Sequence, residues 1–176
     1  MKSKRMSQQD AMFLYGETSE TMMHVAGLMH FTPPPDTPPD YLRHFVNHIK
    51  KTSAIHSPWN MKLKNPHFLR NPLNKWKEDD AFDLDYHIRR SALPTPGDER
   101  ELGILVSRLH SIQIDFTRPP WEMHFIEGLE NGKFAVYVKV HHALVDGYTS
   151  MRILSRSLSE SPDDLNRPMF FSLEPN

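Results

Sequence analysis

The sequence predicts an α+β fold, a two-layer sandwich in which a mixed, mostly antiparallel sheet is covered by helices on one face. Strand-like and helix-like segments both occur, without the strict alternation that parallel sheets require. Asn131-Gly132 separates two strand-like segments, as in a hairpin. With 176 residues and 38% hydrophobic content, the chain is expected to form one domain with a substantial core.

The first third of the chain predicts a short helix or packed arm at residues 8–15, a strand at 22–31, and then an amphipathic helix. Thr37 followed by Asp40 resembles a capping box with proline in the first turn, so this helix is expected to begin there. Its buried stripe recurs at helical spacing: Leu42, Phe45, Val46 and Ile49.

Residues 52–80 are expected to be an irregular covering loop, whose aromatic residues pack inward among many lysines. A strand follows at 85–92. Asp98 is a suitable N-cap for the clearest helix of the chain. The apolar stripe of that helix consists of Leu102, Leu105, Val106, Leu109 and Ile112, which leaves His110 at its boundary.

The hairpin joins residues 121–130 to residues 133–140 through a type I′ turn. If the loop consists of Asn131 and Gly132 alone, its register pairs Phe125 with Val138, Met123 with Val140, and Trp121 with His142. The two-residue strand period then places His142 on the same face as four apolar residues, Phe134, Val136, Val138 and Val140. His141 lies on the opposite face.

The segment His141-His142-Ala143-Leu144-Val145-Asp146-Gly147 joins this strand to a helix expected at residues 148–159. An imidazole at the end of an apolar face is partly desolvated, which favours its neutral form and leaves a ring nitrogen free to accept a proton. Three readings stay open from the residues alone: a base, a structural histidine, or a metal ligand. Adjacent histidines on a strand point to opposite faces, which disfavours the metal.

Composition narrows the classes of function. The 21 basic and 22 acidic residues give a net charge of −1, so no nucleic-acid partner is expected. Cysteine is absent, which excludes disulfides and fits a reducing, cytoplasmic compartment. Neither a secretory signal nor a run of membrane-spanning length is found, although the basic start allows a peripheral contact with a membrane or lipid inclusion.

The His-His-x-x-x-Asp-Gly pattern at residues 141–147 resembles the active-site motif of the acyl-CoA-dependent acyltransferase superfamily, which includes chloramphenicol acetyltransferase and peptide-synthetase condensation domains. More closely, the chain resembles the bacterial wax ester synthase/diacylglycerol acyltransferase family. Supporting segments occur in the family's order at 23–27, 83–89, 99–102 and 115–122. The family's Pro-Leu-Trp element reads Pro119-Pro120-Trp121 here, and its carboxy-terminal half with an Asn-Asp motif is not found.

The resemblance implies one half of a chloramphenicol-acetyltransferase-like fold: residues 1–160 would form the amino-terminal acyltransferase subdomain and residues 161–176 would begin an inter-domain linker. It implies that His142 is the general base, that His141 supports it, and that Asp146 holds the turn through a basic partner. Gly147 would give the chain room to turn. By the same resemblance His24 would line a substrate tunnel, or it is an ordinary buried histidine. If the hairpin register above holds, Trp121 packs against His142 and fixes its ring; the alternative is a plain core aromatic, and the two are compatible.

The implied reaction is acyl transfer from acyl-CoA to a long-chain alcohol or diacylglycerol, with no bound cofactor or metal. The expected partners are these substrates and either the missing carboxy-terminal half or a second copy of the chain. The alternatives are a non-catalytic lipid-binding or interaction module, and a condensation enzyme that uses carrier-bound acyl groups. The flanking segments disfavour the latter.

Overall fold

A four-stranded sheet forms the centre of the computed structural model, which describes residues 3–161, 164 and 167–174. Its order is β2-β7-β6-β5, and only the β5–β6 pair is parallel. The strands are β2 (His24–Phe31), β5 (Ile88–Ala92), β6 (Trp121–Glu127) and β7 (Phe134–His141). The predicted α+β class and the mixed, mostly antiparallel sheet are confirmed.

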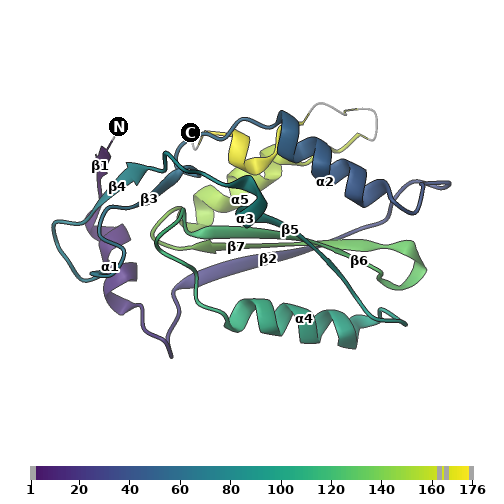
Figure 1. The fold of residues 1–176 in the computed structure, drawn as a ribbon, viewed down its shortest axis with the longest axis horizontal. Coiled ribbons are helices and arrows are strands. Elements are labelled where there is room, and N and C mark those ends of the chain that lie inside the picture. The colour runs from purple at the N-terminus through teal and green to yellow at the C-terminus, as the bar shows by residue number, and fades with distance from the viewer. Residues whose placement is uncertain (1–2, 162–163, 165–166, 175–176) are drawn as a thin grey trace.

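Helices lie on both faces of this sheet, not on one as the sequence predicted (Figure 1). Helices α2 (Tyr41–Thr52) and α5 (Gly147–Ser157) lie on one face, and α4 (Glu99–Ser111) covers the other. The reason is that β6 and β7 are apolar on both sides: Phe125 and Val136 contact the α2 side, whereas Ile126 and Ala135 contact α4.

A second, three-stranded sheet lies beside the first in the order β1-β4-β3. Its strands are β1 (Ser3–Arg5), β3 (Met61–Leu63) and β4 (Lys75–Glu78), so the prediction of an irregular 52–80 segment is wrong for these two short stretches. Trp76 and Leu63 pack with Leu14 of α1 (Gln8–Gly16) and with Ala143 of the histidine motif. This cluster joins the amino-terminal segments to the motif.

The β6–β7 connection is longer than the predicted two-residue turn. Asn131 and Gly132 both have positive φ, as predicted, but residues 128–133 all lie outside the strands. The register is therefore displaced by two residues, and Trp121 pairs with Val140 instead of His142. Gly128, at φ +84°, contributes to the longer loop in a conformation that glycine favours.

Two other boundaries differ from the prediction. Helix α2 begins at Tyr41 with Asp40 as its N-cap, because the Thr37 hydroxyl donates to the Pro34 carbonyl instead of capping a helix. The helical turn α3 (Leu84–His87) occupies the start of the predicted 85–92 strand, capped by the Asp83 side chain.

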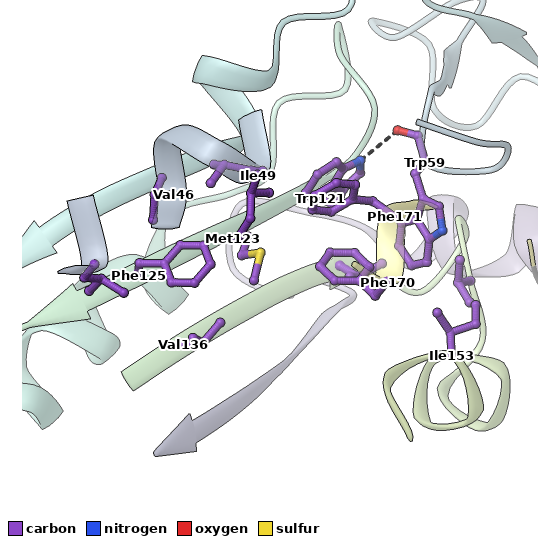
Figure 2. Close-up of a cluster of buried hydrophobic side chains, with 14 residues drawn as sticks. Val46, Ile49, Trp59, Trp121, Met123, Phe125, Val136, Ile153, Phe170 and Phe171 are labelled. Atoms are coloured by element: carbon purple, nitrogen blue, oxygen red, sulfur yellow. Dashed lines mark hydrogen bonds between the residues drawn. The ribbon is translucent and has the colours of Figure 1, made fainter. Parts of the chain in front are cut away.

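The last described residues belong to the core. The 3-10 turn η2 (Phe170–Ser172) places two buried phenylalanines against Trp121 and Trp59 (Figure 2). Residues 161–176 were expected to begin a linker; of these, 162–163, 165–166 and 175–176 lie outside the described residues, as do Met1 and Lys2 of the basic start. The boundary at residue 160 stays a prediction.

Candidate active site

The two adjacent histidines leave the end of β7 in different surroundings. Strand alternation places Lys139 and His141 toward α4 and α1, and Val138 and Val140 toward α5, as the sequence predicted. His141 is fully buried, whereas His142 is only partly buried.

His141 has both ring nitrogens occupied. Its Nδ1 accepts from the Ala143 amide at 3.1 Å, so Nε2 carries the proton and donates to Glu17 Oε2 at 3.2 Å. Burial lowers the pKa of His141 to about 4, since the nearby Glu17 offsets desolvation only in part. His141 is thus a neutral imidazole that fixes the turn after β7.

Glu17 is the residue that sequence analysis missed. Its buried carboxylate accepts from the Met23 amide at 2.5 Å and from the Gln113 side chain at 2.7 Å, as well as from His141. Glu17 follows α1 directly and is 124 positions from His141. No local pattern signals such a partner, because the pairing depends on the tertiary fold.

His142 is held by its backbone and by stacking. Its amide donates to the Met23 carbonyl at 3.0 Å, and its ring stacks on Phe13 of α1, with 4.4 Å between ring centroids and 11° between planes. Nδ1 is buried without a hydrogen-bond partner in the described part of the chain. Neither ring nitrogen forms a hydrogen bond with a described protein group. The ring is therefore held in orientation, and its nitrogens have no described protein partner.

An apolar pocket of about 240 Å³ lies between the sheet and α5, and its lining includes Gly147 but not His142. It is lined by residues of β2, β7 and α5 that include Val25, Val140 and Met151, and by Gly147. A Cβ atom on Gly147 would lie 3.9 Å from His142 Cε1. Gly147 thus borders both the His142 ring and the pocket, and it places no side chain there.

Comparison with known proteins decides the family. The wax ester synthase/diacylglycerol acyltransferase catalytic domain model matches residues 6–176. The chain belongs to this family. A putative diacylglycerol O-acyltransferase of Mycobacterium tuberculosis is 57% identical over 97% of this chain, which covers 34% of that protein. The chain thus spans about a third of the length of such curated relatives.

Solved structures agree with the family. The wax ester synthase/diacylglycerol acyltransferase from Marinobacter aquaeolei VT8 superposes with a TM-score of 0.88 at 40% identity, over 97% of this chain and 42% of that one. The first condensation domain of the calcium-dependent antibiotic synthetase, at 13% identity and a TM-score of 0.63 over 88% of this chain and 37% of that one, shares the fold alone.

The family motif's aspartate acts here as a helix cap. Asp146 is the N-cap of α5: Oδ1 accepts from the Thr149 amide at 2.9 Å and Oδ2 from the Thr149 hydroxyl at 2.7 Å. These two bonds lower the pKa of Asp146. The predicted basic partner is not found among residues 3–161, 164 and 167–174, so within the described chain Asp146 holds the turn through Thr149 instead.

Gly147 is the first residue of α5 and does not have positive φ, so the backbone conformation does not demand glycine there. Its expected role, room for the chain to turn, stays a prediction.

Trp121 does not pack on His142, because the register places it against Val140. Its ring lies between His87 and Phe171, and its Nε1 donates to the Trp59 carbonyl at 2.8 Å (Figure 2). It is a core aromatic, and it is absent from the lining of the pocket beside His142.

His24 also does not line this pocket. It pairs with His141 across the β2–β7 ladder, and therefore faces α4, where its Nε2 lies 2.9 Å from the His110 carbonyl. Burial lowers the pKa of His24. These contacts support the reading of His24 as an ordinary buried histidine. His110 is exposed, as predicted.

No described group of three or more His, Cys, Asp or Glu side chains is arranged to hold a metal ion. The described helices include none with the length and apolar character needed to cross a bilayer.

Proposed function

We propose that this chain carries the proton-accepting half of an O-acyltransferase that moves an acyl group from acyl-CoA to the hydroxyl of a long-chain alcohol or diacylglycerol. His142 is the general base. The observation that carries this proposal is an imidazole without a described hydrogen-bond partner, oriented by Phe13, with Gly147 bordering both its ring and an apolar pocket.

The reaction needs one group that accepts and returns a proton. The hydroxyl oxygen attacks the thioester carbonyl carbon while His142 takes the hydroxyl proton. The carbon–sulfur bond then breaks, an ester remains, and the departing thiolate receives the proton from His142. No acyl-enzyme and no bound cofactor is required, and His141 and Asp146 fix the turn without touching substrate.

The apolar surroundings support a long-chain substrate. A second apolar pocket of about 240 Å³ shares Met29, Val138, Leu154 and Phe170 with the first, so apolar surface continues along the sheet from Gly147. Such a surface suits an acyl or alkyl chain and excludes water that would hydrolyse the thioester. Both pockets are open to solvent in this chain. Complete exclusion of water from the site is therefore assigned to the carboxy-terminal part of the relatives or to a second copy of the chain.

The test is ester formation from palmitoyl-CoA and hexadecanol, by this chain alone and with a separately expressed carboxy-terminal part of a family member. His142→Ala is expected to lower turnover about 1000-fold, the usual contribution of a general base. His48→Ala is the matched control, since His48 is exposed on α2.

The result also decides between the enzyme and its alternative. If His142→Ala abolishes turnover and His48→Ala leaves it unchanged, the result supports His142 as the general base. If turnover requires the added carboxy-terminal part, the active site is shared between the two parts. Absence of turnover from folded chains that bind each other would leave a non-catalytic lipid-binding or interaction module. A contact with a membrane or lipid inclusion is also proposed, and its surface is assigned below.

A further inference from the structure

The small sheet places like charges opposite each other. Arg5 of β1 pairs with Lys75 of β4, and Lys77 of β4 pairs with Lys62 of β3. The alternate residues Trp76 and Leu63 are buried, so the cations share the outer face. Cross-strand pairs of like charge destabilise a sheet, so this arrangement has a cost within the chain itself.

Only one of these cations has an internal counter-charge. Lys62 donates to Asp79 at 2.6 Å. Arg5, Lys75 and Lys77 form no ion pair with any residue that the structure describes, and these three define the basic face. An external anion would relieve their repulsion.

Exposed apolar side chains lie beside the basic face, in the loop from 64 to 74 that joins β3 to β4. Phe68 is 69% exposed and Leu73 is 77% exposed. The loop is held in shape by the buried Asn74, whose amide group bonds to the backbone of Asn65 and Phe68. Two large apolar groups are therefore presented to the outside by an ordered loop.

The loop is also fixed to the wall of the active site. Arg70 donates to the Tyr15 carbonyl at the end of α1, and Leu69 packs into the cluster that contains Ala143 of the motif. The loop thus lies beside α1, the helix whose Phe13 stacks on His142 (Figure 1). A surface that docks this loop would lie close to the site.

We infer that the basic face and the 64–74 loop form a docking surface for an anionic phospholipid layer. Such a layer offers negative headgroups to Arg5, Lys75 and Lys77, and hydrocarbon to Phe68 and Leu73, without requiring a shaped partner. The choice of lipid rests on the proposed function, in which both substrates are lipids. Binding is measured without turnover, so the two proposals can fail separately.

The experiment is flotation of the chain with vesicles of equal parts phosphatidylglycerol and phosphatidylcholine, beside vesicles of phosphatidylcholine alone. Binding is expected only to the anionic vesicles and is expected to be lost at about 0.5 M salt, where screening acts over about 4 Å. Each basic residue contributes about fivefold to partitioning, so the triple variant Arg5→Gln/Lys75→Gln/Lys77→Gln should bind about 100-fold more weakly.

The apolar part has its own variant. Phe68→Ala/Leu73→Ala is expected to weaken binding about tenfold, because both side chains would leave the hydrocarbon boundary. Its control is Ile104→Ala/Ile112→Ala, on α4 and directly after it, where the two side chains are 55% and 54% exposed. Arg100→Gln/Arg108→Gln/Lys133→Gln, exposed on α4 and in the β6–β7 connection, removes the same number of positive charges and controls for net charge.

Folding is checked in every variant by thermal unfolding. The triple variant removes like-charge pairs, so its Tm should be unchanged or higher. Equal binding to neutral vesicles, or equal loss of binding in the control variants, would overturn the inference. A third result would also overturn the inference: vesicle binding that is abolished by inorganic polyphosphate but unchanged in Phe68→Ala/Leu73→Ala. The ligand of the basic face would then be a soluble anion.

Discussion

The two faces of β7 differ most at the end that carries the histidines. Toward α4 the polar side chains are held by protein groups: Lys139 donates to the Leu109 and Ile112 carbonyls at 2.8 Å, and His141 bonds at both nitrogens. Toward α5 the strand is apolar, and the ring of His142 has no described partner. Residue type is the same at positions 141 and 142, so the proposed difference in reactivity rests on which ring nitrogens lack a protein partner.

The strongest way to test this contrast is to remove each histidine in turn and measure stability. His141→Ala leaves the Glu17 carboxylate buried without one of its donors, which should cost about 3 kcal/mol and lower Tm by about 10 °C. His142→Ala should change Tm by less than about 2 °C. Equal Tm values for the two variants would refute the division into a structural and a reactive histidine.

The dependence of stability on pH tests an exception to this contrast. The α2 side of the sheet also contains a buried histidine. His87 stacks on Trp121 and Phe82, and burial lowers its pKa from 6.5 to about 4, as it does for His141. The unfolded chain binds these protons near pH 6.5 and the folded chain only near pH 4. Stability is therefore complete above pH 6.5 and falls as the pH decreases from 6.5 to 4.

Each of these histidines should account for about 3 kcal/mol of that loss. Chemical denaturation at several pH values between 4 and 7 measures it. In His87→Phe the slope below pH 6.5 should be smaller than in the parent chain, since His141 and His24, whose pKa values burial also lowers, still contribute. An unchanged slope would mean that His87 is protonated in the folded chain at the same pH as in the unfolded one.

A smaller effect is expected from closing the gap between His142 and the pocket. Gly147→Val places methyl groups beside His142 Cε1 without opposing the helical backbone, so kcat/KM should fall about 30-fold with little change in Tm. Gly103→Val is the matched control, because a Cβ there meets open space on α4. The substrates are those used to test His142. Full activity in Gly147→Val would show that this gap is not used.

The sequence was informative where the pattern is local. Alternation along residues 134–142 assigned the two faces correctly, and Asp98 with the stripe from Leu102 to Leu109 placed α4. Ile112, the last residue of the predicted stripe, follows the helix and is exposed, because the helix ends at Ser111. Helix α5 was also expected, and it spans Gly147–Ser157 with Ile153 as its buried residue. Met151 is exposed because that side of the helix borders an open pocket.

Long-range features could not be predicted in this way. The hairpin register depends on how many residues join the turn, and Asn131-Gly132 specifies only their conformation. Strands β1, β3 and β4 have three or four residues each and are stable only as a set. Glu17 was missed for the same reason, because its partner lies at the other end of the folding unit.

The position of Glu17 limits which segments can be exchanged between relatives to make a chimera. The motif at 141–147 is held by contacts with Phe13 of α1 and with Glu17 and Met23, which lie between α1 and β2. A chimera that exchanges only the histidine motif between relatives would separate it from these contacts. The exchangeable unit consists of two stretches, roughly residues 3–24 and 121–149, and crossover points for chimeras are better placed outside both.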